Sequence, residues 1–174
     1  MGSDEQDVHS RRKGVIMGKR IDYLDDPAAP KANSVVPSAN VIVVNDQDEI
    51  LMIRRTDNDN WAIPGGGMDL GESITDAAIR ETQEETGIIC EITGLVGIYT
   101  NPHHVILYTS NGEVRQEFSI VFTARPVDGV LRPSSETSEP QWMSAAVLPN
   151  LQMDPSMRQR IEHYLDKRPE PYLR

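Results

Sequence analysis

The chain has 174 residues, of which 38% are hydrophobic and 25% charged, as is usual for one globular domain with a single core. Its formal net charge of −10 argues against nucleic acid as a partner, because a polyanion binds best to a basic surface. Cys90 is the only cysteine, which excludes intramolecular disulfides and thiolate zinc sites. Aliphatic runs are too short to span a membrane and residues 1–20 lack the apolar core of a signal peptide, so we expect a cytoplasmic protein with no membrane partner.

The beginning of the chain differs in composition from the rest. Residues 1–35 are polar, contain Pro27 and Pro30, and show no sustained periodicity, so they predict an N-terminal extension that is partly disordered. Within it, 21–24 is a candidate short strand. We therefore expect one domain over 36–168, followed by a short tail at 169–174.

Hydrophobic patterns predict strands and two helices in the following order. Strands are expected at 40–44, 50–54, 88–92, 97–100, 105–109, 114–124 and 142–143, and helices at 73–86 and 155–166. Asn111 and Gly112 predict a hairpin with a type I′ turn, which needs positive φ at both positions. Ser73 is a candidate N-cap with Asp76 three residues later, and Gly87 a natural helix stop. Strands on both sides of a central helix predict an α/β fold with a mixed sheet in layers.

Three glutamates share one face of the first predicted helix. At about 100° per residue, Glu81, Glu84 and Glu85 fall within an arc of roughly 100°. Like charges at this spacing repel one another, and a divalent cation such as Mg²⁺, which prefers hard oxygen ligands, turns that repulsion into affinity. Gly65–Gly67 precede the helix and lack side chains that would keep a ligand away from the backbone.

This stretch resembles the Nudix box, G-x5-E-x7-R-E-U-x-E-E-x-G-U, in which U is a bulky aliphatic residue. Every fixed residue is present at its spacing, and the one departure is Thr82 at a position that is usually aliphatic. The matching residues are Gly66, Glu72, Arg80, Glu81, Glu84, Glu85, Gly87 and Ile88. The preceding Trp61 to Gly66 and the later Trp142 also look like the family, so the resemblance spans most of residues 38–165.

The resemblance implies a Nudix-type α/β/α sandwich with a mixed β-sheet and a Mg²⁺-dependent hydrolase, with Mn²⁺ as an alternative ion. Glu81, Glu84 and Glu85, helped by the Gly66 carbonyl, would hold the metal, while Arg80 belongs to the catalytic group as the residue that orders these ligands. Glu72 would support the loop. The general base differs between subfamilies; Glu81, Glu84 and Glu136 are the candidates, and Glu139 is the fallback.

The box does not specify the substrate. Pro102, fifteen residues after Gly87, resembles the downstream proline of the ADP-ribose pyrophosphatase subgroup, so a nucleoside diphosphate sugar is favoured, with ADP-ribose first. The alternatives are a nucleoside triphosphate cleaved to the monophosphate and pyrophosphate, and a Nudix-fold sensor that binds a nucleotide without cutting it.

Four residues are candidate substrate contacts, and one candidate partner is a second copy of the chain. Only one of the adjacent Arg54 and Arg55 can point inward from a strand. The candidates that we select are Arg54, Arg115, Gln116 and Trp61. A homodimer built through the N-terminal extension is also compatible with the family.

Overall fold

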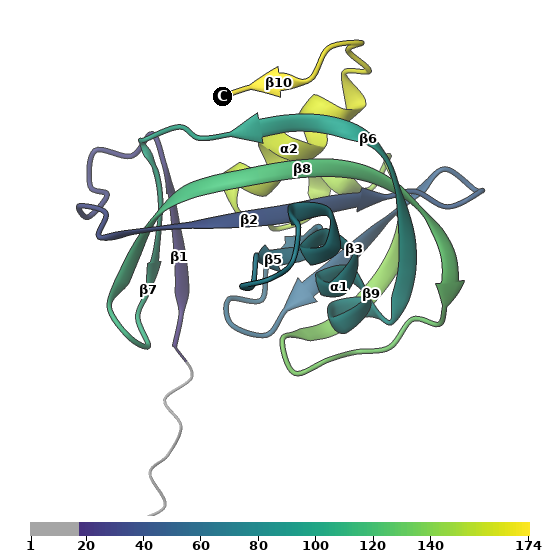
Figure 1. Cartoon of the computed structure of the whole chain (residues 1–174), viewed down its shortest axis with the longest axis horizontal. Coiled ribbons are helices and arrows are strands. Elements are labelled where there is room, and N and C mark those ends of the chain that lie inside the picture. Colours follow the sequence, from purple (N-terminus) through teal and green to yellow (C-terminus); the bar gives the residue numbers. More distant parts are fainter. Residues whose placement is uncertain (1–17) are drawn as a thin grey trace, which may run out of the picture.

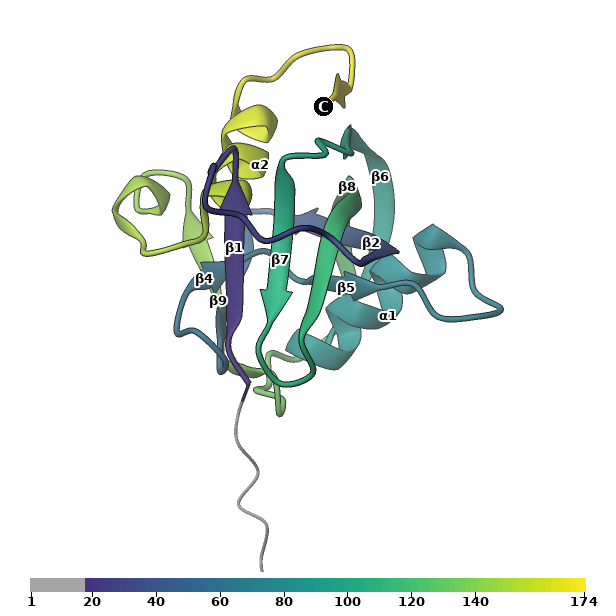
Figure 2. The ribbon, with the colours of Figure 1, turned by 90° about the vertical axis from the view of Figure 1, so that its left-hand side faces the viewer.

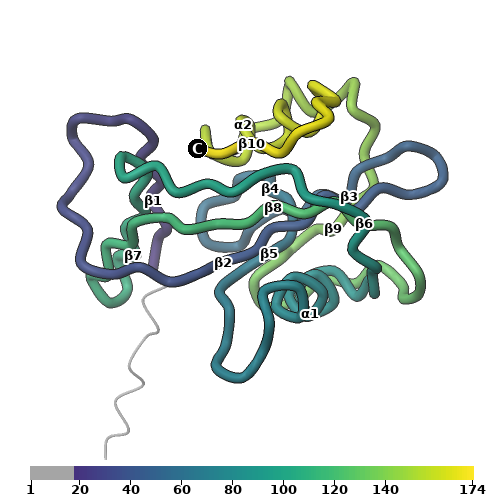
Figure 3. The backbone as a smooth tube through the Cα atoms, turned by 45° about the horizontal axis from the view of Figure 1, so that its top comes forward, coloured from purple at the N-terminus to yellow at the C-terminus, as the bar shows by residue number. Residues whose placement is uncertain are grey.

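A computed structural model describes residues 18–174, so the expected disorder at the very start of the chain lies outside the described residues. The strands lie between helix α1 on one side and helix α2 on the other, which Figure 3 shows most clearly (Figures 1 and 3). This arrangement confirms the predicted α/β/α sandwich. The strands are β1 (Arg20–Leu24), β2 (Ser34–Val43), β3 (Glu49–Arg55), β4 (Trp61–Ala62), β5 (Gly65–Gly67), β6 (Ile88–Tyr99), β7 (His104–Tyr108), β8 (Glu113–Gly129), β9 (Thr137–Ser144) and β10 (Tyr172–Leu173). The helices are α1 (Ile74–Thr86), a short 3₁₀ helix η1 (Leu148–Asn150) and α2 (Pro155–Leu165).

The larger sheet is mixed, as predicted, and is organised around the long strand β8. Along one edge β8 runs parallel to β2; along the other it pairs antiparallel with β7 and then with β6. On its far side β2 pairs antiparallel with β5, so Ser38 lies opposite Gly67. A smaller sheet has the order β4-β3-β9. The larger sheet therefore places the glycine loop beside β2, close to the first half of β8.

Both ends of the described chain add strands to the larger sheet. β1, from the segment expected to be an extension, pairs antiparallel with β7 and forms an edge of the sheet (Figure 2). β10, from the expected tail, pairs parallel with β6. Short apolar segments such as these carry little periodicity of their own, so their pairing depends on the strand edge that they meet.

The hairpin between β7 and β8 forms where it was predicted, but its turn type was predicted wrongly. Tyr108 pairs with Glu113, which leaves a four-residue loop. Gly112 has φ of 75°, whereas Asn111 is not at positive φ. A type I′ turn needs both, and the longer loop needs only the glycine in the left-handed region.

Helix α1 begins and ends as its sequence predicts. The Ser73 side chain accepts a hydrogen bond from the backbone N–H of Asp76, whose carboxylate in turn accepts one from the Ser73 N–H. At the other end Gly87 takes the left-handed conformation with φ of 81°. This capping box satisfies N–H groups that would otherwise lack partners, so both helix limits follow from local chemistry. Thr82, the departure from the box, is fully buried and donates its hydroxyl to the Ala78 carbonyl.

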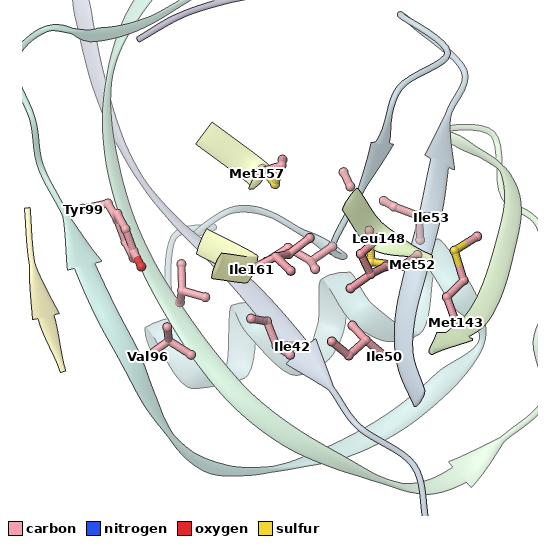
Figure 4. Packing of buried hydrophobic residues seen from close by; sticks show 13 residues of the cluster. Ile42, Ile50, Met52, Ile53, Val96, Tyr99, Met143, Leu148, Met157 and Ile161 are labelled. Atoms are coloured by element: carbon pink, nitrogen blue, oxygen red, sulfur yellow. The ribbon is translucent and has the colours of Figure 1, made fainter. Parts of the chain in front are cut away.

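A continuous hydrophobic cluster joins α2 to the strands beneath it (Figure 4). Met157 and Ile161 of α2 pack with Ile42 of β2, Ile50 of β3 and Val96 of β6. Met157 and Ile161, four positions apart, therefore define the face that α2 buries. Among the described residues, no helix is both long enough and apolar enough to cross a membrane.

Candidate functional site

A cleft of about 340 Å³ opens where the glycine loop, the N-terminal strands and α2 meet. One part of its wall carries the carboxylates Glu81 and Glu84 of α1 together with Glu136, which immediately precedes β9. Another part carries arginines and aromatic or aliphatic side chains of β1, β7, β8 and α2. Three predicted site carboxylates and Gly66 are thus brought to one cavity from segments up to 70 residues apart in the chain.

Gly66 allows the loop to touch the carboxylate of Glu81. A Cβ built on Gly66 would lie 2.5 Å from both Cδ and Oε1 of Glu81. Any side chain at this position would displace the Glu81 carboxylate, so the absence of a Cβ is a steric requirement of the site. The role expected for this glycine, close approach of the backbone to a charged centre, fits its position.

Arg80 holds the carboxylates in place from behind the cleft. Its Nε and Nη2 donate to the two oxygens of Glu72 at 2.9 and 2.7 Å, and its Nη1 donates to Glu81 at 2.9 Å and to Glu84 at 3.2 Å. Nη2 also donates to the Gly67 carbonyl at 3.1 Å. A planar guanidinium with five donors can satisfy all of these acceptors at once. Arg80 and Glu72 therefore order the loop and the carboxylates of Glu81 and Glu84, and neither Arg80 nor Glu72 lines the cleft.

Glu85 lies beneath the loop and does not line the cleft, although it was expected among the metal ligands. It is 3% exposed, and its Oε2 accepts a hydrogen bond from the Gly65 N–H at 2.9 Å. Burial raises the pKa of Glu85 to about 8, an effect that the Gly65 hydrogen bond and the charge of Arg55 only partly offset. In this arrangement Glu85 anchors the glycine loop to the helix.

The oxygen donors Glu81, Glu84 and Glu136 suit a hard divalent cation, although their carboxylates do not converge on one point in this structure. Within residues 18–174, no three His, Cys, Asp or Glu side chains are close enough together to hold a metal ion. Burial raises the pKa of Glu81, and the charges of Glu84 and Glu136 add to this effect while Arg80 opposes it. The accumulated negative charge favours a cation. The exposed Glu84 side chain can rotate toward one because, within residues 18–174, Arg80 is the only residue whose side chain bonds to it.

Another wall of the cleft is one face of the strands β1, β7 and β8. The register places Arg20 of β1 opposite Tyr108 of β7, and Ile106 of β7 opposite Arg115 of β8. Arg115 donates from Nε and Nη2 to Glu113, at 3.0 and 3.1 Å, and lies 4.9 Å from the Tyr108 ring centroid. Its Nη1 has no hydrogen-bond partner among the described residues. Arg115, a predicted contact, therefore lines the cleft with one amino group still available.

A buried polar network forms the floor between these two walls. Arg160 of α2, 2% exposed, donates to Asn40 Oδ1 at 2.6 Å and approaches Glu117 Oε1 at 3.4 Å. Ser38 donates to the same Glu117 oxygen at 2.9 Å, and Ser119 donates to Asn40 at 3.1 Å. Burying a charged pair costs desolvation energy that only hydrogen bonds and the opposite charge can offset. This network links β2, β8 and α2 beside the cleft.

Three of the predicted substrate contacts lie outside the cleft. Arg54 points to the other side of β3, where it pairs with Asp59 at 2.8 Å and with Glu139 at 3.6 Å; the neighbouring Arg55 lines the cleft instead. Gln116 alternates with Arg115 and so faces away. Trp61 packs on the hydrophobic cluster under α2. Strand parity explains the first two corrections, because successive side chains point to opposite faces. Glu139, the fallback base, also lies outside the cleft, beside Arg54.

The sequence interpretation missed several residues of the cleft. Arg20 is buried in an ion pair with Asp22 at 2.9 Å and with Asp154 at 2.6 Å, and it comes from the segment set aside as an extension. Glu117 and Arg160 carried no signal in isolation, since a charged residue in a predicted strand or helix is most simply solvent-exposed. The one usable signal was the alternation along β8, which puts Glu117 on the same face as Arg115.

Comparisons with known proteins agree with this geometry. The family model described as "NUDIX domain" matches residues 35–164. A putative 8-oxo-dGTP diphosphatase of Bacillus subtilis is 32% identical over 126 residues, covering 72% of this chain and 77% of that protein. An ADP-ribose pyrophosphatase of Methanocaldococcus jannaschii is 31% identical over 115 residues, covering 64% of each chain. A solved NUDIX hydrolase from Nitrosomonas europaea has the same fold, with a TM-score of 0.63 at 23% identity over 79% of this chain and 93% of that one.

Proposed function

Because the chain belongs to the Nudix family of hydrolases, which act on phosphorus anhydrides, we propose that its substrate is a nucleoside diphosphate derivative, with ADP-ribose or another nucleoside diphosphate sugar favoured. The observation that carries this proposal is the division of the cleft. Glu81 and Glu84 line the cleft from α1 and Glu136 lines it from the loop before β9, whereas Tyr108 and Arg115 line it from β7 and β8. A nucleotide with a diphosphate matches this division, because it joins a strongly anionic centre to less charged sugar and base groups.

The carboxylate wall supplies the chemistry in this proposal. Members of the family generally use divalent metals, and Mg²⁺ or Mn²⁺ bound by Glu81, Glu84 and the Gly66 carbonyl would neutralise the diphosphate and lower the pKa of a water molecule. Arg80 and Glu72 keep these ligands oriented. Positioned charge of this kind is the main source of catalysis in phosphoryl chemistry.

Glu136 is the general base that we propose. Both Glu81 and Glu84 accept hydrogen bonds from Arg80, so protonating either one breaks an existing contact. Among the described residues, no arginine or lysine forms a salt bridge with Glu136, and its carboxylate lines the same cleft. Glu136 can therefore accept a proton from a water molecule without breaking the hydrogen bonds that Arg80 donates to Glu81 and Glu84. Removing a general base typically costs 10²- to 10⁴-fold in rate.

A nucleoside triphosphate is the second candidate substrate, because a relative 32% identical over 126 residues is named a putative 8-oxo-dGTP diphosphatase. ADP-ribose is supported by the relative that is named for its hydrolysis. Both substrates present a diphosphate next to a nucleoside, so the cleft accommodates the same chemistry in either case. The products distinguish them: AMP with ribose 5-phosphate from ADP-ribose, and a monophosphate with pyrophosphate from a triphosphate.

The experiment incubates the protein with Mg²⁺ and a panel of ADP-ribose, other nucleoside diphosphate sugars and nucleoside triphosphates, and separates the products by chromatography. We expect AMP from ADP-ribose, loss of turnover in EDTA and its return with added Mg²⁺. Glu84→Gln and Glu136→Gln should each lower kcat at least 100-fold. Glu139→Gln is the matched control, because it removes a nearby carboxylate that lies outside the cleft.

Each remaining outcome changes a different part of the proposal. Pyrophosphate release from a triphosphate would replace the substrate and keep the mechanism. Equal losses in Glu136→Gln and Glu139→Gln would remove Glu136 as the base. Nucleotide binding without turnover of any substrate would overturn the hydrolase and leave a sensor.

A further inference from the structure

We propose that Glu117 determines substrate specificity in this cleft: its free carboxylate oxygen accepts a hydrogen bond from an N–H or O–H donor on the nucleoside part of the substrate. The inference rests on the proposed function for the identity of the ligand as a nucleotide. It adds the group that the cleft selects, which neither the box nor the likeness to relatives specifies.

The geometry of Glu117 leaves one oxygen available. The residue is 5% exposed and lines the cleft from β8. Both of its hydrogen bonds, from Ser38 at 2.9 Å and from Arg160 at 3.4 Å, end on Oε1. No described residue donates to Oε2. A carboxylate can accept about four hydrogen bonds, so Oε2 keeps acceptor capacity for a ligand that enters the cleft.

The charge on Glu117 fixes the kind of group that it selects. Burial alone would raise the pKa of Glu117, but the charges of Arg160 and His104 and the Ser38 hydroxyl outweigh burial and hold the pKa below its usual value. At neutral pH the side chain is therefore ionised and only accepts hydrogen bonds. A substrate group that presents a lone pair to Oε2 is repelled, and a group that presents an N–H or O–H is bound.

Glu117 also lies within reach of a nucleoside whose diphosphate occupies the box. Ser38, which donates to Glu117, pairs in the sheet with Gly67 of the glycine loop. The strand that pairs with the loop therefore also carries the hydroxyl that binds the Glu117 carboxylate. On the other side, Ile106 and Tyr108 of β7 provide an apolar and aromatic wall suited to a flat ring or a sugar face.

Two parts of a nucleoside carry the donors that this inference concerns: the ribose hydroxyls and the exocyclic amine of a base such as guanine. Each forms the same charge-assisted hydrogen bond to a carboxylate. A hydrogen bond to a charged group changes affinity on the order of 10- to 100-fold, and a ligand that lacks the donor cannot make this contact. The preferred nucleotide should thus bind more tightly than the analogue that lacks the donor, by about this factor.

The test measures binding of nucleoside monophosphates in EDTA, which separates recognition from turnover and from metal. Isothermal titration compares AMP with its 2′-deoxy and 2′,3′-dideoxy analogues for the sugar donors, and GMP with IMP for the exocyclic amine. We expect one of these series to show a preference of about 10-fold or more in the unmodified protein. Glu117→Gln should reduce that preference to near unity. Glu91→Gln, an exposed carboxylate on β6 that pairs with Arg125, is the matched control and should keep the preference.

The preference is the ratio of two dissociation constants measured on the same protein. It therefore keeps its meaning even if part of the Glu117→Gln protein is unfolded. Equal binding of all analogues by the unmodified protein overturns the inference without any variant, as does a Glu117→Gln protein that keeps the original ratio. Failure of the proposed function looks different. In that case no substrate is hydrolysed in Mg²⁺, while the binding preference and its dependence on Glu117 persist.

Discussion

Replacing Arg160 with methionine should destabilise the fold through the carboxylate that it leaves behind. Methionine keeps an unbranched apolar stem in the space of the buried arginine, so little packing is lost. Glu117 then becomes a buried charge without its cation, which costs about 3–5 kcal/mol, and Asn40 Oδ1 loses its 2.6 Å donor but keeps Ser119. We expect the free energy of unfolding to fall by about 4 kcal/mol, or Tm to fall by about 8–16 °C for a chain of this size.

The double variant Arg160→Met/Glu117→Gln tests the stated cause. If the unpaired charge dominates, neutralising Glu117 should restore about half of the lost stability, measured by urea unfolding at pH 7. Acid gives a second check. In the parent, the lowered pKa of Glu117 contributes stability that is present above its unfolded pKa and is lost as pH falls. In Arg160→Met, burial raises the pKa of Glu117, because the arginine no longer opposes it. The difference in unfolding free energy between the parent and the variant should therefore become smaller as the pH falls. A double variant less stable than Arg160→Met would refute the reasoning.

Three further predictions concern the loop, the N-terminal strand and the helix cap. Gly66→Ala should lower kcat on the order of 100-fold with little change in Tm, because the new Cβ displaces the flexible end of Glu81; Gly67→Ala, whose Cβ would meet only a side-chain carbon at 3.5 Å, should retain far more activity in the same assay. Asp22→Asn should cost about 2 kcal/mol at pH 7, since burial of Asp22 is outweighed by His104 and Arg20, which lower its pKa from 3.8 to about 2. That stability is present above pH 4 and lost as pH falls toward 2, so acid unfolding curves of the two proteins should converge there; parallel curves would contradict the assignment. Ser73→Ala should lower the free energy of unfolding, measured in urea, by about 1 kcal/mol. A change near zero would mean that Asp76 caps the helix alone.

The box helix shows how much local sequence can determine. Ser73, Asp76 and Gly87 define its limits because the cap bonds and the left-handed glycine involve residues within four positions of one another. The spacing of Glu81 and Glu84 likewise placed both carboxylates toward one side, since helix geometry converts position into angle. The family and its hydrolytic chemistry followed from this segment alone. The same geometry did not reveal that Glu85 turns beneath the loop, because the Gly65 N–H that it binds belongs to another element.

The other wall of the cleft was decided by the tertiary structure. Whether Arg54 or Arg55 faces the cleft depends on which side of β3 is covered, and a strand's own alternation leaves both choices open. Arg20 reaches the cleft only because β1 pairs with β7, and Glu117 is buried only because Arg160 arrives from α2, 43 positions later. A buried ion pair has no sequence signature, because each partner alone reads as a surface residue and only the fold supplies the opposite charge. The sequence by itself therefore determined the family and the segment that carries its carboxylates, whereas contacts between distant strands and a helix decided which side chains line the rest of the cleft.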